Sequence, residues 1–188
     1  RGTDYVALRP VQHPIPPENH LTIIGATTEL AEIIKPLRDR FSWLARFEPY
    51  TDEDMTQIIQ RMATMMDLAP SEDEAAALGV AAASTPRQAR NLILTARDLG
   101  TTNPAEILEV AGITPDGLTE EHVEYLLALG RLDNRAGVDN LANLLGLPKD
   151  ILKELEHLLI TKGYLILGPK GRELTILGMQ RTRELNQS

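Results

Sequence analysis

The chain has 188 residues, of which 43% are hydrophobic and 24% are charged, a composition typical of a soluble globular protein. It contains no cysteine, which excludes disulfides and thiolate metal sites and favours an intracellular setting. No apolar run approaches the roughly 20 residues that span a bilayer, so we expect no membrane partner. The net charge of −8 argues against a uniformly basic, nucleic-acid-binding surface.

The C-terminal end is more basic than the rest of the chain. Residues 161–188 carry five lysines and arginines against two glutamates, which leaves a local charge of +3. A local contact with nucleic acid at this end is therefore compatible with an acidic chain, because the distribution of charge matters more than its sum.

The N-terminal segment is typical of an extended lead-in followed by a buried strand. Residues 1–20 contain four prolines and no helical period. Residues 21–26 are apolar and β-branched, which predicts a buried parallel strand. Such a strand needs sheet neighbours, and too little sequence precedes it to supply them. We therefore expect the chain to begin inside an α/β domain of a longer protein.

Helix-start signals then follow one another over residues 50–112. The signals are capping boxes at 51–54 and 71–74, and the N-cap–proline pairs Thr85-Pro86 and Asn103-Pro104. Behind the first box, five apolar side chains fall on one helical face: Met55, Ile58, Ile59, Met62 and Met66. These patterns predict a unit of four helices.

The remaining sequence predicts three helices and a two-stranded hairpin. Residues 112–117, rich in glycine and proline, form the best candidate linker. Beyond it we expect helices from Thr119, over 138–145 and over 149–161, then a strand at 164–167, a turn at 168–171 and a return strand near 174–176. This order is that of the winged helix-turn-helix.

Four segments, in this order along the chain, resemble the RuvB type of AAA+ motor ATPase. They are residues 21–28 with 36–41, residues 84–87, residues 137–142, and residues 163–165 with 169–172. The resemblance implies a mainly α chain with three parts. These are a remnant of the α/β AAA+ core (1–48), a four-helix AAA+ lid (49–114) and a winged-helix DNA-binding domain (115–188).

The resemblance also implies an ATP-dependent Holliday junction helicase that drives branch migration in recombination and repair. Such a protein is cytoplasmic, forms a homohexameric ring, binds ATP with Mg²⁺ and works with a junction-recognition protein. In this sequence Thr28 (less favoured, Thr27) would be sensor 1, and Arg40 (alternatively Arg38) would be the arginine finger. Arg87 would be sensor 2, and Tyr50 and Pro86 would flank the adenine.

Two elements of an ATP site are missing from these residues. The phosphate-binding pattern G-x-x-x-x-G-K-[ST] does not occur, nor does an acidic Walker B strand. We therefore predict that this chain alone neither hydrolyses ATP nor binds a cofactor tightly. The four histidines lack metal-ligand spacing and are interpreted as surface or structural, so no metal site is predicted.

The DNA-binding residues are expected on the third helix of the winged helix and on its hairpin. They are Lys149, Lys153, Lys162, Lys170, Gly171 and Arg172, with the glycine allowing close approach to phosphate. A junction motor acts on any sequence, so contacts with duplex or four-way-junction phosphates are expected. The hairpin carries Ile166 and Leu167 where the family usually has polar or basic residues.

Two other classes of function stay open on the sequence. One is a related AAA+ initiator or clamp-loader-like switch, whose winged helix would bind one defined sequence. The other is an inactive RuvB-like protein-interaction module, which the −8 charge and the missing phosphate loop favour.

Overall fold

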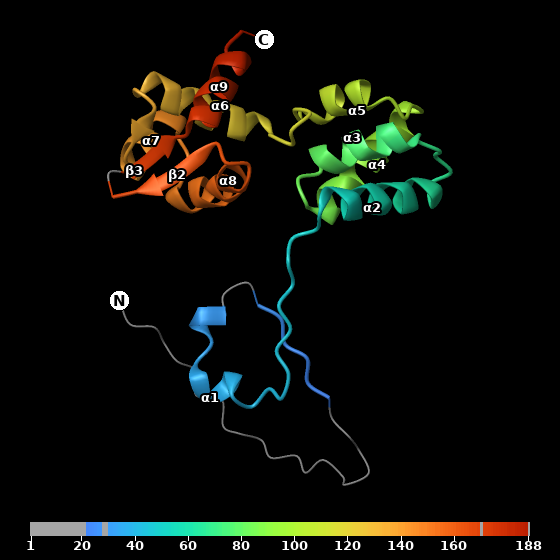
Figure 1. Cartoon of the computed structure of the whole chain (residues 1–188), viewed down its shortest axis with the longest axis horizontal. Coiled ribbons are helices and arrows are strands. Elements are labelled where there is room, and N and C mark those ends of the chain that lie inside the picture. Colours follow the sequence, from blue (N-terminus) through green and yellow to red (C-terminus); the bar gives the residue numbers. More distant parts are fainter. Residues whose placement is uncertain (1–21, 28–29, 170, 188) are drawn as a thin grey trace. The chain divides into compact units, whose positions relative to one another are not determined.

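The computed structural model describes residues 22–27, 30–169 and 171–187, and the chain divides into two units, residues 1–47 and 48–188 (Figure 1). The first unit contains a 3₁₀ turn, η1 (Leu30–Glu32), and a short helix, α1 (Lys35–Arg38). Residues 22–27 are irregular, and Ile24 is 89% exposed. The predicted buried strand is therefore wrong. The described residues of this unit include no strand that could complete its hydrogen-bond ladder.

The four predicted helices of the central region are confirmed. They are α2 (Asp52–Thr64), α3 (Glu72–Ala81), α4 (Pro86–Leu99) and α5 (Pro104–Ala111). The first capping box forms as expected, since Thr51 Oγ1 accepts a hydrogen bond from the Asp54 amide at 3.1 Å and Asp54 Oδ2 accepts one from the Thr51 amide at 3.0 Å. The Thr51 amide and hydroxyl both donate to the Asp54 carboxylate, and these hydrogen bonds lower the pKa of Asp54.

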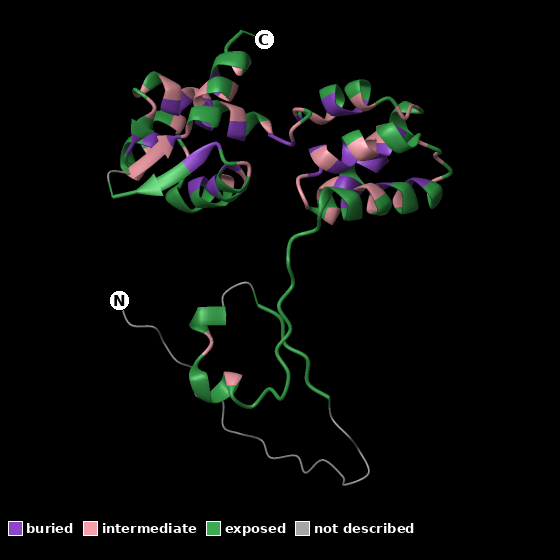
Figure 2. Cartoon of the chain, viewed as in Figure 1, coloured by how far each residue is buried: buried purple, intermediate pink, exposed green. Residues whose placement is uncertain are grey.

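The apolar faces of α2–α5 enclose a core, seen as the purple inner faces of this bundle in Figure 2. Met55, Ile59 and Ala63 of α2 are fully buried there, as the predicted apolar face requires. The closest approach is at Gly79 of α3, where an added Cβ would lie 3.0 Å from the Thr56 amide nitrogen of α2. The C-terminal end of α3 therefore packs directly on the first turn of α2.

The C-terminal region forms a winged helix, as predicted. Its elements are α6 (Glu120–Arg131), β1 (Arg135–Ala136), α7 (Val138–Leu145), α8 (Lys149–Thr161), β2 (Leu165–Gly168), β3 (Gly171–Leu174) and α9 (Ile176–Leu185). The strands pair antiparallel in the order β1-β3-β2. A second hydrophobic core lies beneath this sheet, built around Tyr125, Leu126, Leu152 and Leu165.

The predicted return strand of the hairpin is wrong in its position. The return strand is Gly171–Leu174, so the prediction placed it a few residues too late. Thr175 instead starts α9, because its hydroxyl accepts a hydrogen bond from the Gly178 amide at 3.0 Å. The two-residue strand β1 was not predicted, because so short a segment carries no alternation.

The segment predicted as a linker is anchored to the winged helix by Asp116. Its Oδ1 accepts hydrogen bonds from Arg181 Nη2 at 2.6 Å and Thr114 Oγ1 at 2.7 Å, and its Oδ2 accepts one from the Tyr164 hydroxyl at 2.8 Å. Burial opposes ionisation of Asp116, but these donors hold its pKa below the usual value. Burial and the same hydrogen bond raise the pKa of Tyr164 to about 12. This cluster fixes the start of the winged helix to its last helix.

His122 caps the first turn of α6. Its Nδ1 accepts a hydrogen bond from the Thr119 amide at 3.2 Å, so the ring occupies the place that Glu or Gln takes in a usual capping box. Burial lowers the pKa of His122, because the buried ring is disfavoured in its charged form. The structural interpretation of this histidine is consistent with that geometry.

We expect the winged helix to become less stable as the pH falls, and we expect part of this loss to depend on His122. Because the folded pKa lies below 6.5, the contribution of this ring is present above pH 6.5 and is lost as the pH falls below it. His122→Gln keeps the cap with a group that does not titrate. Urea unfolding followed by circular dichroism at pH 7.5 and 5.5 should show a smaller pH difference in the variant. An equal difference would contradict this role.

Candidate nucleic-acid interface

The predicted lysines of α8 occupy an exposed face. Lys149 and Lys153 are one helical turn apart, so both side chains point in the same direction. Lys149 Nζ forms an ion pair with Asp139 Oδ1 at 2.5 Å, but its side chain stays 56% exposed. In the described residues Lys153 takes part in no ion pair, and Lys162 lies half-buried at the C-terminal end of the helix. This face offers cations to a phosphate backbone.

Arg172 lies inside the domain, contrary to its predicted place on the surface of the wing. Its Nε donates to Glu156 Oε1 at 2.7 Å and its Nη2 donates to Glu156 Oε2 at 3.2 Å. The two side chains are only 16% and 4% exposed. The hydrogen bond to Glu156 raises the pKa of Arg172 further. The guanidinium is therefore occupied within the fold, and a phosphate contact by this residue does not follow from the structure.

Gly171 has a packing role that the sequence did not reveal. Its φ is +112°, and an added Cβ would overlap the carbonyl oxygen of Ala136 in β1. The glycine is thus required by the close approach of β3 to β1. Its predicted approach to phosphate stays a prediction. Lys170, the other predicted contact in this turn, lies outside the described residues.

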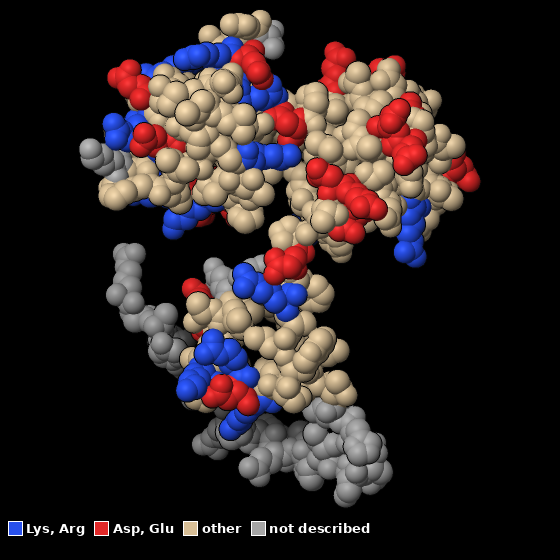
Figure 3. All heavy atoms as spheres, viewed as in Figure 1, with Lys and Arg blue, Asp and Glu red and all other residues tan. Residues whose placement is uncertain are grey.

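The basic character of the C-terminal end is weaker than the sequence count indicates. Besides Arg172, Arg181 is held internally, because its guanidinium binds Asp116. Residues 115–188 as a whole carry nine lysines and arginines against eleven acidic residues, and residues 49–114 carry four against ten. Figure 3 shows acidic side chains gathered on the visible face of the α2–α5 bundle, and both signs of charge interspersed on the winged helix. Any nucleic-acid contact is therefore local.

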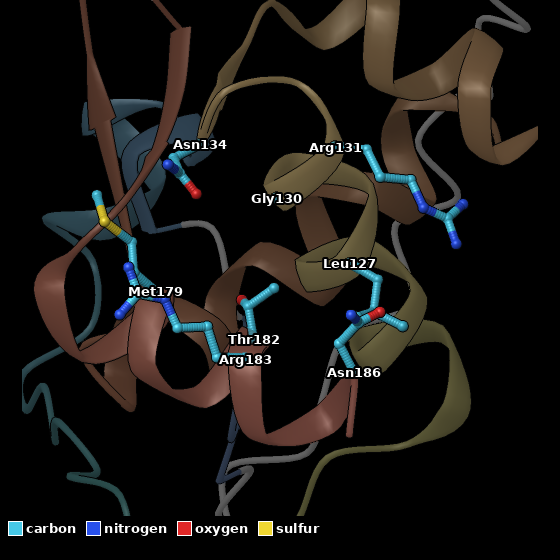
Figure 4. A pocket seen from close by; sticks show the side chains of 8 residues that line it. All are labelled: Leu127, Gly130, Arg131, Asn134, Met179, Thr182, Arg183 and Asn186. Carbon is cyan, nitrogen blue, oxygen red and sulfur yellow. The ribbon is translucent and has the colours of Figure 1, made fainter. Parts of the chain in front are cut away.

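A second cationic region, which sequence reasoning missed, surrounds a hollow of about 320 Å³ between α6 and α9. The hollow is lined by Leu127, Gly130, Arg131, Asn134, Met179, Thr182, Arg183 and Asn186. Figure 4 shows the guanidinium groups of Arg131 and Arg183 extending away from each other. They do not converge on one point, so the hollow is not a built anion site.

The wing carries an exposed apolar surface next to its turn. Ile166 and Leu167 of β2 are 51% and 55% exposed, and Ile176 and Leu177 at the start of α9 are 78% and 50% exposed. Ile166 and Leu167 are therefore surface residues. Exposed aliphatic side chains of this size often mark an interaction surface.

The residues predicted for the ATP site fall in both units of the chain. Arg40, in the first unit, follows α1 and is exposed, and Arg38 is half-buried. Thr28 lies outside the described residues, while Thr27 lies in the irregular segment that precedes η1. Tyr50, which precedes α2 in the second unit, is 49% exposed.

Pro86 and Arg87 form the first turn of α4, whose N-terminus is unlike those of α2 and α3. The Thr85 hydroxyl donates to the Ala83 carbonyl at 3.2 Å and does not cap the helix. Ala83 and Ser84 both have positive φ, +49° and +58°, and this strained pair redirects the chain into α4. The exposed Arg87 side chain and a first turn without a side-chain cap favour an anion here.

The described residues show neither a membrane helix nor a metal cluster. None of their helices is both long and apolar enough to cross a bilayer. No three of their His, Asp and Glu side chains are grouped so as to hold a metal ion.

The three helices and the antiparallel β1-β3-β2 sheet of the C-terminal region define a winged-helix domain. The family profile of the RuvB C-terminal winged helix domain matches residues 115–182. The Holliday junction branch migration complex subunit RuvB of Mycoplasmopsis pulmonis (strain UAB CTIP) is 31% identical over 170 residues. That match covers 84% of this chain and 54% of the relative.

Solved structures agree with this relationship. The Thermotoga maritima RuvB Holliday junction branch migration motor is 27% identical, with a TM-score of 0.71, over 80% of this chain and 55% of that one. A point mutant of the same protein gives 28% identity, a TM-score of 0.71, and 80% and 54% coverage. Over most of its length the chain is similar to RuvB proteins, and residues 115–182 match the RuvB C-terminal winged helix domain. The chain spans about half the length of the relatives it matches.

We expect Gly171→Ala to destabilise the winged helix by about 2–3 kcal/mol, because the new methyl group overlaps the β1 backbone. Gly168→Ala is a matched control in the same hairpin, since an added Cβ there would lie 3.9 Å from its nearest neighbour. Thermal unfolding followed by circular dichroism measures both. Equal melting temperatures for the two variants would exclude this role of Gly171.

Proposed function

We propose that this chain supplies the duplex-DNA contact and the rim of the ATP site in a RuvB-type Holliday junction branch-migration motor. The observation that carries the proposal is the exposed pair Lys149 and Lys153 on α8, within a domain that matches the RuvB winged helix. The names of the curated relative and of the solved motor support the same activity.

The proposed DNA contact is made to phosphate and not to base edges. The α8 face offers lysines, which bind phosphate as point charges. The neighbouring strand β3 carries Arg172, but its guanidinium is bound to Glu156 inside the domain. Lys149 and Lys153 are interspersed with Asp150 and Glu154, so the local field is modest. Weak, sequence-independent and salt-sensitive binding follows from such a surface.

For ATP, we propose that Arg87, Pro86 and Tyr50 form one edge of the nucleotide site. Tyr50 lies just before α2, Pro86 and Arg87 open α4, and the two helices share one core, which supports this. For Thr28 and Arg40 of the first unit we keep the roles that the resemblance implies, sensor 1 and an arginine finger that reaches a neighbouring subunit's site. Arg87 would stabilise the negative charge of the ATP phosphates, and no residue of this chain is proposed to hold Mg²⁺.

The proposal also includes the assembly of the motor and its partner protein. We propose a ring of identical subunits and a separate protein that recognises the junction, as the resemblance implies. Since the residues of this chain hold neither a phosphate-binding loop nor a Walker B strand, the catalytic centre needs further sequence.

A protein-interaction role for the winged helix is the second candidate. The exposed Ile166, Leu167, Ile176 and Leu177 favour it, as does the excess of acidic over basic residues in this domain. In that case the domain would bind no DNA at low salt. Binding restricted to one defined sequence would instead indicate an initiator.

The DNA proposal is tested by fluorescence anisotropy with duplex and four-way-junction DNA at two salt concentrations. Lys153→Ala should weaken binding equally for unrelated sequences and reduce the slope of log affinity against log salt by about 1. Arg183→Ala, which removes an exposed cation from α9 instead, serves as the control. Equal losses in both variants, or no loss in Lys153→Ala, would exclude α8 as the contact.

We also expect this chain alone to release no phosphate from ATP, with or without DNA. The reason is that the groups which hold the phosphates and Mg²⁺ are absent from its sequence. A colorimetric phosphate assay measures this, and the same preparation should bind DNA as a check of its integrity. Phosphate release that depends on Arg40 would contradict the expectation.

A further inference from the structure

Three side chains from separate elements meet in the interior of the winged helix. Tyr125 of α6 donates its hydroxyl hydrogen to Glu156 Oε1 of α8 at 2.9 Å. Arg172 of β3 donates to both oxygens of the same carboxylate, at 2.7 and 3.2 Å. Burial and the adjacent carboxylate raise the pKa of Tyr125, so its hydroxyl keeps the proton it donates. Each carboxylate oxygen thus has a donor.

This contact connects the DNA-facing helix to the wing. Among the described residues, no other side-chain hydrogen bond or ion pair joins α8 to β2 or β3. β3 is the central strand, and Arg172 is paired in register with Leu167 on one side and Ala136 on the other. Holding Arg172 therefore holds both neighbouring strands and the turn beyond them.

We propose that Glu156 and Arg172 are positioning residues, which set the wing against α8 so that both meet the same duplex. The proposal rests on the proposed DNA contact and deepens it. Lys149 and Lys153 would bind phosphate, whereas Arg172 acts only through Glu156. For Arg172 to turn towards DNA, Glu156 would be left buried without its cation, which is strongly unfavourable.

Glu156→Gln separates this role from a direct contact, because the two predict changes of opposite sign. If Arg172 bound phosphate, loss of the competing carboxylate would release it and strengthen DNA binding. As a positioning residue, Glu156 should instead weaken binding about threefold or more when it is replaced, with an unchanged salt slope. Glu154→Gln, an exposed acid on the same helix, removes the same charge and should bind DNA slightly more tightly than the wild type.

Arg172→Lys is the second variant, because it keeps the charge and loses the two-point geometry. Lysine also binds phosphate, so a direct contact would leave affinity near the wild-type value. A positioning role predicts weaker binding with the same salt slope, which reports the number of phosphates neutralised. Circular dichroism spectra and melting curves of both variants establish that the binding measured is that of folded protein.

A measurement without DNA keeps the two proposals separable. Amide hydrogen exchange of β2 and β3 should be faster in Glu156→Gln than in the wild type, while α2–α5 are unaffected. If wild-type protein binds no duplex at low salt, the DNA proposal fails, and this exchange still tests the positioning of the wing. The positioning proposal is overturned if wing exchange is unchanged, or if Glu156→Gln binds DNA as tightly as Glu154→Gln.

Discussion

The winged helix depends on one buried carboxylate. Glu156 is 3% exposed, and an ionised acid at such a site is stable only when both oxygens receive hydrogen bonds from suitable donors. Tyr125 of α6 and Arg172 of β3 supply them, so the acid fixes α6, α8 and β3 relative to one another. The arginine that sequence reasoning assigned to DNA is thereby committed to the interior. Without Arg172, the positive charge that DNA can contact comes from α8 and from the rest of the described surface.

A second carboxylate fixes the entrance of the domain in the same manner. Asp116 joins Tyr164 and Arg181, so the segment that leads from the α2–α5 bundle is tied to the last helix and to the start of the hairpin. The segment predicted as a linker is therefore fixed to the winged helix through Asp116.

The sequence predicted features that depend on neighbouring residues, such as helix starts. It missed features that depend on contacts between distant parts of the chain. Caps and first-turn prolines gave the starts of α2–α5, since those interactions lie within four residues of each other. The strand at 21–26 failed because a strand needs partners that lie elsewhere. The role of Arg172 was hidden because its partner is 16 residues away. One signal was present: Glu156 falls on the apolar face of α8 between Leu152 and Leu159, where a lone acid indicates a buried partner.

The candidate site was predictable only in part for the same reason. Exposed lysines at one-turn spacing follow directly from the helical period, so Lys149 and Lys153 lie where the sequence put them. His122 at the third position after a Thr N-cap could have been identified as a cap, because that position usually holds Glu or Gln. The hollow between α6 and α9 carried no such signal, since its lining combines residues about fifty positions apart.

The proposed binding of duplex DNA to α8 and the wing can be followed by two-dimensional amide NMR of the isotopically labelled chain during titration with a short duplex. We expect shifts concentrated on α8 around Lys149 and Lys153 and on the β2–β3 hairpin, with the same pattern for unrelated sequences. Shifts confined to α6 and α9, with α8 unchanged, would contradict this proposal.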